Sequence, residues 1–306
     1  MTKVLIATEK PFAKEAIDLI RPVLEHAGYE MVLLENYTQK QDLIDAVTDC
    51  EALIIRSDIA DAEVIEAAKK LKIVVRAGAG YNNIDLDACT KAGIVAMNTP
   101  GQNSNAVAEL ALGMMVYSAR GLFDGKTGTE LKGKTLGIHA YGNVGRLAAT
   151  IAKGFGMEIY AFDPYVAAEN IEKDGVKALH SAEDLYAKCQ YISLHIPAND
   201  KTKKSIGKTL LSLMPKGAML VNTARKEVIH EEELMQLMQE RKDFKYVSDI
   251  EPDMAAAFKE AFGNRVYFTP KKMGAQTAEA NINAGVAAAE QIVDFLEKGI
   301  DSCRVN

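Results

Sequence analysis

Two glycines and one acid in the middle of the chain have types and spacing that could do chemistry. Gly142 and Gly145 follow the apolar run 135–140, and Asp163 lies 18 residues after Gly145. Glycine lets the backbone approach a pyrophosphate, and the free N–H groups that begin the following helix favour its negative charge. A carboxylate at Asp163 can accept hydrogen bonds from both ribose hydroxyls. Because it would also repel a 2′-phosphate, the spacing predicts NAD rather than NADP.

The elements that must position these residues are a strand, a tight turn, a helix and a second strand between Lys134 and Pro164. Apolar residues recur at helical spacing through Phe155, and Glu158–Phe162 is a predicted strand. The usual GxGxxG fingerprint begins with glycine, whereas this chain has Ala140, and such a turn can also be purely structural. We favour the nucleotide site because all the elements are in register. The predicted contacts are Tyr141, Gly142, Asn143, Val144, Gly145, Asp163 and Pro164.

The composition is typical of a globular protein and argues against nucleic acid, membrane and metal partners. The chain has 306 residues, 48% hydrophobic and 25% charged, which predicts about two globular domains. A net charge of -6 without a dense Lys/Arg stripe argues against nucleic acid or membrane partners. The four cysteines and five histidines lack the spacing of metal ligands, so no metal site is expected. With no signal peptide and no long apolar span, we expect a cytoplasmic protein.

Strands and helices alternate along both halves of the chain, which predicts an α/β protein with two doubly wound parallel sheets. Ligands of such sheets gather at the carboxyl ends of the strands. In the first half, Arg56, the Gly78–Gly80 turn and Asn98 should therefore face one cleft. The strand ends of the second half present His195, Thr223–Arg225, Asp249–Glu251, Lys271 and Lys272.

Several segments, in this order, resemble the D-2-hydroxyacid dehydrogenases: ALIIRS, RAGAGYNNID, NTPGQNSNAVAE, the nucleotide-binding unit, SLHIP, VNTAR, an acidic EP and TPKKMGAQTAEA. The resemblance covers nearly the whole chain, and the ordered set is highly specific. It implies a Rossmann-like NAD-binding domain at 99–282 and a flavodoxin-like substrate domain at 1–98 and 283–306. It also implies a homodimer through Ser104–Arg120. A short form of the family, without an appended regulatory domain, is expected.

The family uses arginine, glutamate and histidine as its catalytic trio. By resemblance, Arg225 in VNTAR holds the substrate carboxylate and polarises the carbonyl, and Glu251 pairs with the acid/base. Where the family has Pro-His-x-Gly-Ala, this chain reads TPKKMGA, which places Lys272 at the histidine position. The resemblance extends to a subgroup with such a lysine. We therefore predict Lys272 as the acid/base, with Lys271 as the alternative and a purely structural ion pair also open.

A lysine is an unusual base for this chemistry. Its ordinary pKa of about 10.4 leaves it mostly protonated at neutral pH. Burial and Arg225 would lower the pKa of Lys272, whereas Glu251 would raise it. The sequence does not decide between these effects.

The remaining site residues follow from the same resemblance. Arg56 and Ser57 correspond to the phosphate end of 3-phosphoglycerate, although Arg56 could equally form a salt bridge at the domain edge. The predicted substrate-carboxylate cradle is Ala77, Gly78, Ala79 and Gly80, with Asn98 and Asn103 nearby. The predicted nicotinamide-side contacts are His195, Ile196, Pro197, Thr223, Ala224 and Asp249, the last toward the carboxamide.

The function predicted from the sequence is the NAD-dependent oxidation of 3-phosphoglycerate to 3-phosphohydroxypyruvate, which leads to serine. A cation at Arg56 favours this substrate, because lactate or glyoxylate enzymes need none there. The alternatives are another D-2-hydroxyacid dehydrogenase of glyoxylate, hydroxypyruvate or lactate type, or an NAD-sensing binding module like the corepressors related to this family.

Overall fold

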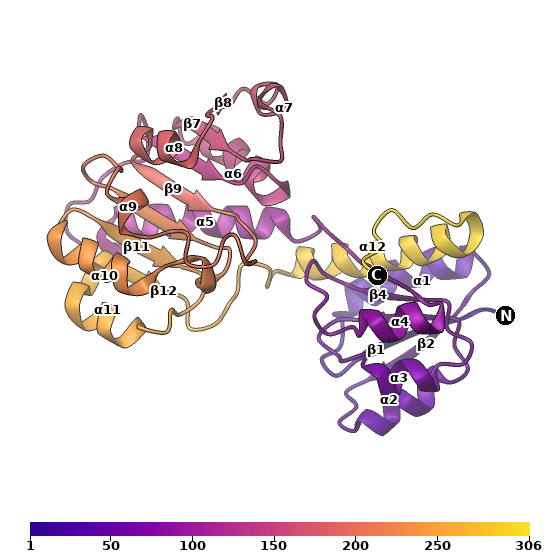
Figure 1. Ribbon diagram of the computed structural model, residues 1–306. Coiled ribbons are helices and arrows are strands. Elements are labelled where there is room, and N and C mark those ends of the chain that lie inside the picture. Colours follow the sequence, from indigo (N-terminus) through magenta and orange to yellow (C-terminus); the bar gives the residue numbers. More distant parts are fainter. The chain divides into compact units, whose positions relative to one another are not determined.

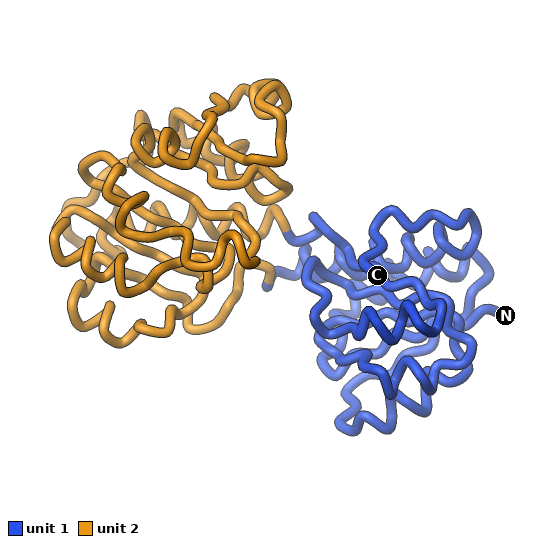
Figure 2. The backbone as a smooth tube through the Cα atoms, viewed as in Figure 1, with its two compact units in different colours: residues 1–103, 276–306 blue, residues 104–275 orange.

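Two parallel sheets flanked by helices organise the chain, which a computed structural model describes over residues 1–306 (Figure 1). Unit 1 comprises Met1–Asn103 and Gln276–Asn306, and unit 2 comprises Ser104–Ala275 (Figure 2). The predicted α/β class with two parallel sheets is confirmed. The assignment of one domain to substrate and the other to NAD stays a prediction.

The sheet of unit 1 has five parallel strands in the order β2-β1-β3-β4-β5. Apart from the edge strand β2, which begins and ends with Glu, its strands are mostly apolar and buried, as expected for parallel strands that helices cover on both faces. Alternate residues feed two cores, because Val4 and Ile6 pack toward α1 and α12 whereas Leu5 and Ala7 pack toward α2, α3 and α4. The strands are β1 Lys3–Thr8, β2 Glu30–Glu35, β3 Ala52–Ile55, β4 Ile73–Arg76 and β5 Val95–Asn98; the helices are α1 Lys14–His26, α2 Lys40–Val47, α3 Ala62–Ala67, α4 Leu86–Ala92 and α12 Ala278–Lys298.

The sheet of unit 2 has seven parallel strands in the order β12-β11-β10-β9-β6-β7-β8. The strand order reverses beside β6, and such a switch point is where open α/β sheets bind ligands. The strands are β6 Thr135–His139, β7 Glu158–Phe162, β8 Lys177–Ala178, β9 Tyr191–Leu194, β10 Met219–Asn222, β11 Lys245–Ser248 and β12 Val266–Phe268; the helices are α5 Ser104–Ala119, α6 Asn143–Gly154, α7 Ala168–Glu172, α8 Ala182–Lys188, α9 Lys208–Leu211, α10 Glu231–Glu240 and α11 Ala255–Phe262.

Candidate active site

The glycine turn joins β6 to α6 at the switch point of unit 2. Ala140 has a φ of 79°, a left-handed conformation that usually selects glycine and that explains the family's preference at this position. At Gly145 a Cβ would lie 2.3 Å from the Ala140 carbonyl oxygen, so only glycine lets α6 start this close to the turn. A Cβ at Gly142 would instead enter open space, and no side chain caps the helix. The exposed N–H groups that begin α6 therefore suit a pyrophosphate.

Asp163 follows β7 and already faces this turn. Its two carboxylate oxygens accept hydrogen bonds from the backbone N–H groups of Tyr141 and Tyr165, each at 2.8 Å. Each oxygen keeps a further lone pair for a ligand hydroxyl. The Tyr141 side chain is buried and donates to Asp174, which leaves only its backbone at the turn, and Pro164 beside Asp163 is exposed.

Two histidines meet at the ends of β6 and β9. The His195 N–H donates to the His139 carbonyl at 3.0 Å, and the His195 ring lies 3.0 Å from the Ser193 hydroxyl. The His139 ring contacts the Tyr186 hydroxyl at 3.1 Å. Burial lowers the pKa of His139 to about 4 and that of His195 to about 3, so both rings are neutral at pH 7. Beyond them, Ile196 is buried and Pro197 exposed.

The buried His139 should make the fold sensitive to acid. Its pKa is about 4 in the fold against about 6.5 in the unfolded chain, so its stabilising contribution is complete above pH 6.5 and declines as the pH falls toward 4. We expect a loss of about 2–3 kcal/mol of unfolding free energy over this range, measured by urea unfolding. His139→Gln should lose this part of the pH dependence, whereas His180→Gln, at an exposed histidine, should keep it. An unchanged profile in His139→Gln would contradict the assignment.

The turn after β10 is shaped by a residue that the sequence analysis did not single out. The Asn222 side chain donates to the Arg225 carbonyl at 2.9 Å and accepts from the Ala224 N–H at 3.0 Å. Next to it, the Thr223 hydroxyl is buried and has no hydrogen-bond partner. Because buried hydroxyls are normally paired, this orphan suits a ligand group such as the NAD that the sequence predicts.

Two cations converge on one carbonyl beside this turn. The Ala224 oxygen accepts hydrogen bonds from the Lys272 amine and from Arg225 Nη1, the latter at 3.0 Å. Arg225 is exposed and Lys272 half-buried, and neither forms an ion pair with a carboxylate. Lys271 is exposed. The structure thus places Arg225 and Lys272 on one acceptor, and their catalytic roles stay predictions.

The pKa of Lys272 is lowered to about 8, first by burial and then by Arg225. Asp249 and Glu227 raise the pKa of Lys272, but their effect is smaller than the combined effect of burial and Arg225. The sequence left this direction open, and it expected the opposing charge to come from Glu251. In the structure Glu251 is exposed and pairs with Lys259 of α11 instead. Glu251 as the partner of the acid/base stays a prediction.

Asp249 fastens the segment that carries Lys272. It is 1% exposed and accepts hydrogen bonds from the Thr269 hydroxyl at 3.0 Å and from the N–H groups of Met273 at 2.9 Å and Gly274 at 2.7 Å. Asp249 therefore holds the TPKKMGA segment against the end of β11. The predicted contact with a carboxamide would use its remaining lone pairs.

In unit 1, Arg56 lies at the end of β3 among neutral partners. Its guanidinium donates to Asn281 Oδ1 at 2.6 Å and to the Lys10 and Pro11 carbonyls at 3.2 Å, and it lies 4.9 Å from the centre of the Phe12 ring. The alternative of a salt bridge for Arg56 finds no partner, because no ion pair involves it. Ser57 beside it is exposed.

Arg76, at the end of β4, is a candidate that the sequence reasoning missed. Its Nε donates to the Arg56 carbonyl at 3.1 Å. Burial lowers the pKa of both arginines, and Arg56 lowers that of Arg76 further, which indicates two neighbouring cations. The signal was available, since Arg76 ends the strand beside β3 and directly precedes the predicted cradle. Two unpaired guanidiniums suit an anion with several oxygens, such as a phosphate.

The Gly78–Gly80 turn is positioned by its neighbours. Gly78 has a φ of 149°, and a Cβ there would lie 1.5 Å from Arg76 Nη1, so glycine makes room for that guanidinium. The Asn98 side chain donates to the Ala79 carbonyl at 2.7 Å, and the Thr99 N–H donates to the Gly78 carbonyl at 3.0 Å. Of the other predicted residues, Ala77 is buried and Asn103 half-buried.

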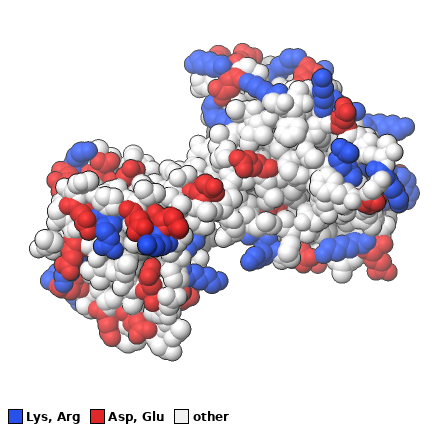
Figure 3. All heavy atoms as spheres, turned by 180° about the vertical axis from the view of Figure 1, so that it is seen from behind, with Lys and Arg blue, Asp and Glu red and all other residues white.

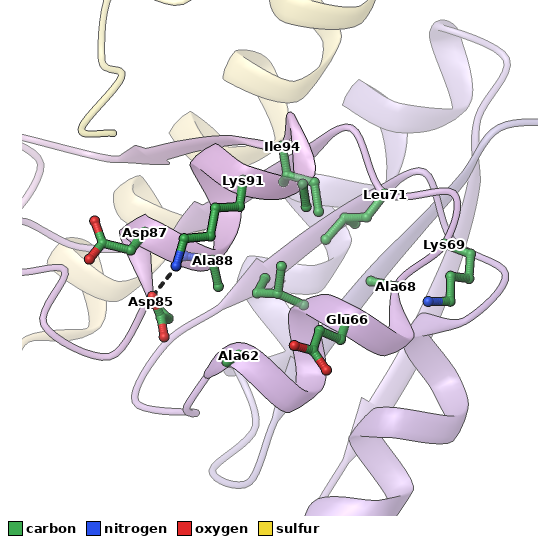
Figure 4. A pocket seen from close by; sticks show the side chains of 12 residues that line it. Ala62, Glu66, Ala68, Lys69, Leu71, Asp85, Asp87, Ala88, Lys91 and Ile94 are labelled. Carbon is green, nitrogen blue, oxygen red and sulfur yellow. Dashed lines mark hydrogen bonds between the residues drawn. The ribbon is translucent and has the colours of Figure 1, made fainter.

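One cavity of unit 1 lies apart from the predicted substrate residues. A cavity of about 590 Å³ lies between α3 and α4 of unit 1, with Glu66, Asp85 and Lys91 around it and none of the predicted substrate residues (Figure 4). Figure 3 shows charged side chains of both signs intermixed over the visible faces. None of the helices contains an apolar stretch of the length that a membrane span requires. No group of three or more His, Cys, Asp or Glu side chains is arranged to hold a metal ion.

Comparison with known proteins yields one family. The family model described as "D-isomer specific 2-hydroxyacid dehydrogenase, NAD binding domain" matches residues 119–270. D-3-phosphoglycerate dehydrogenase of Methanocaldococcus jannaschii is 36% identical over 97% of this chain and 58% of its own length. The chain thus spans little more than half of that relative.

Two further proteins match along nearly their full length. Hydroxypyruvate reductase of Thermotoga maritima is 33% identical over 98% of this chain and 100% of its own. The crystal structure of NAD+-bound 3-phosphoglycerate dehydrogenase in Entamoeba histolytica is 48% identical, covers 100% of this chain and 98% of that one, and has a TM-score of 0.85.

Proposed function

Because the chain belongs to the D-isomer specific 2-hydroxyacid dehydrogenase family, we propose that it oxidises 3-phosphoglycerate to 3-phosphohydroxypyruvate with NAD. This reaction would lead to serine. The observation that carries the choice of substrate is the pair Arg56 and Arg76, two neighbouring guanidiniums that form no ion pair, although Asp58 raises the pKa of Arg56. An unphosphorylated hydroxyacid has no phosphate for these two guanidiniums to bind. The similarity to phosphoglycerate dehydrogenases supports the same substrate.

In this proposal unit 2 binds NAD, and Arg56 and Arg76 of unit 1 bind the phosphate of the substrate. The glycine turn and the start of α6 would hold the pyrophosphate, and Asp163 the ribose. Thr223, His195 and Asp249 would line the nicotinamide side. NAD supplies the hydride acceptor when it is bound.

The chain's own residues then handle the carboxylate and the proton. The exposed Arg225 fork binds the substrate carboxylate and stabilises charge on the reacting oxygen. The neutral Lys272 amine takes the hydroxyl proton during oxidation, and the ammonium returns it during reduction. The hydrogen bond to the Ala224 carbonyl orients the amine. A pKa of about 8 allows both forms near neutral pH.

The test of the substrate is a comparison of KM values. Arg56→Gln and Arg76→Gln should each raise the KM for 3-phosphoglycerate about 10- to 100-fold, because a hydrogen bond to a charged group contributes about 1.5–3 kcal/mol. The KM for glycerate, which lacks the phosphate, should change far less. NADH absorbance measures both. Equal effects on the two substrates would contradict a phosphate role for these arginines.

A second candidate is the reduction of hydroxypyruvate or a similar 2-oxo acid. It is favoured by the full-length match to a hydroxypyruvate reductase. The purified protein, assayed against 3-phosphoglycerate, glycerate, lactate, hydroxypyruvate and glyoxylate, separates the two candidates. A kcat/KM for hydroxypyruvate far above that for 3-phosphoglycerate would favour this alternative.

We also propose a homodimer through α5 and the turn that follows it. The only charged residue of α5 is Glu109, a composition typical of a helix covered on all sides. Yet Phe123 is 66% exposed and stacks edge-on against Tyr117 at 5.0 Å, which in turn meets Tyr267 at 4.9 Å. Leu122 and Phe123 both have a φ of 58°, an unfavourable conformation that presents this aromatic group. Exposed aromatics of this kind are typical of interface centres.

Phe123→Glu should therefore dissociate the dimer. A charge at the centre of an apolar interface is strongly unfavourable. Light scattering should give the mass of two chains for the wild type and of one chain for the variant. Leu213→Glu, at an exposed residue that does not line the surface of α5, serves as the matched control and should stay dimeric. A monomeric wild type would contradict the proposal.

We also propose a cytoplasmic location, because all four cysteines are free thiols, as is usual in a reducing compartment.

A further inference from the structure

The arrangement around Lys272 also suits a second kind of chemistry. The amine is half-buried, donates to the Ala224 carbonyl and shares that acceptor with the Arg225 guanidinium. No carboxylate forms an ion pair with it. Lys271, its neighbour in sequence, is exposed. A desolvated lysine beside another cation is the environment that converts an amine into a nucleophile.

We propose that Lys272 forms a reversible imine with 2-oxo acids bound through Arg225. The inference rests on the proposed function, because the oxo acid would be the product of the same site. It adds a covalent step that hydride transfer does not require. Since an amine in an imine cannot serve as the acid/base, the adduct would inhibit the enzyme at high concentrations of the oxo acid.

Charged groups from three neighbouring segments act on the amine. Arg225, after β10, lowers the pKa of Lys272, while Glu227, in the 3₁₀ turn 226–228, and Asp249, after β11, raise it. Together with burial, which lowers it, these charges give Lys272 a pKa of about 8, so about half of the amine is neutral at pH 8. The hydrogen bond to Ala224 uses one N–H and leaves the nitrogen lone pair available.

The step balances without an oxidant or reductant. The Lys272 nitrogen attacks the C2 carbonyl carbon of the oxo acid, a C–N bond forms, and the carbonyl oxygen gains a proton from the nitrogen. The resulting carbinolamine loses water, and the C=N bond of the imine forms. Hydrolysis reverses both steps. Arg225 promotes the attack by holding the carboxylate beside the amine, which raises the effective concentration of the ketone.

The experiment traps the imine in the protein without NAD. Purified protein at pH 8 is incubated with pyruvate and sodium cyanoborohydride, and the adduct is found by intact mass and peptide mapping. We expect a single adduct on Lys272 that forms several-fold faster than on any surface lysine. Lys272→Arg keeps the charge and should lose this adduct, whereas Lys271→Ala should keep it. Arg225→Gln should slow its formation.

Two outcomes would overturn the inference: labelling spread evenly over the exposed lysines, or equal labelling of the wild type and Lys272→Arg. Turnover measured on the same preparation separates this result from the proposed function. A protein that reduces 2-oxo acids with NADH but does not label Lys272 contradicts only the imine. Labelling of Lys272 without turnover of any hydroxyacid contradicts only the dehydrogenase function.

Discussion

Lys272→Ala is expected to lower kcat for hydroxyacid oxidation about 10²- to 10⁴-fold, the usual range for loss of a general acid or base. NAD binding should persist, because Lys272 lies outside the glycine turn. In the wild type, kcat/KM for oxidation should rise with pH and level off above about pH 8, since the neutral amine is the base and its pKa is lowered to about 8.

The nature of the base can be read from the pH profile of a second variant. Lys272→His should retain part of the activity and move the inflection toward about pH 6.5, the ordinary pKa of histidine. Lys271→Ala is the matched control and should keep the wild-type profile. NADH absorbance from pH 6 to 10 measures all three proteins. Near-normal turnover in Lys272→Ala would exclude it as the acid/base and would direct attention to Lys271.

The sequence predicted the sheets well because their strands carry a strong signal. Runs such as KVLIAT and IVVR are apolar on both faces, which parallel strands covered by helices require. Three short elements, α4, α7 and β8, were not predicted from the sequence. The helix α4, Leu86–Ala92, has only seven residues, too few for a clear apolar period, and Asp85 begins it by accepting from the Ala88 N–H at 2.9 Å. The five-residue α7 and two-residue β8 were missed for the same reason.

Site residues at strand ends could be predicted because strand order follows from chain order. Their side-chain partners could not, because they depend on packing between distant segments. Lys259 approaches Glu251 only because α11 folds back along β12. Likewise, Arg76 folds against the turn only where Gly78 lacks a Cβ. The pKa of Lys272 reflects burial, which a motif does not report.

Gly145→Ala should weaken NAD binding and destabilise the fold. The new Cβ would lie 2.3 Å from the Ala140 carbonyl oxygen and 2.9 Å from Ile138 Cγ2, so the start of α6 must move away from β6. Overpacking of this kind costs about 1–3 kcal/mol of stability. Because the displaced N–H groups no longer point at the pyrophosphate, we expect NAD affinity to fall at least about tenfold, which corresponds to about 1.4 kcal/mol. Calorimetric titration and urea unfolding measure the two effects.

Two other glycines separate the steric effect from the loss of the phosphate cradle. Gly154→Ala, at the far end of the same helix, places its Cβ in open space and should be stabilising by up to about 1 kcal/mol with unchanged NAD affinity. Gly142→Ala also meets no protein atom, so the fold should remain as stable as the wild type. Its methyl group would nevertheless occupy the space in front of the α6 N-terminus and should weaken NAD binding. Full NAD affinity in both Gly142→Ala and Gly145→Ala would mean that the pyrophosphate does not lie at this turn.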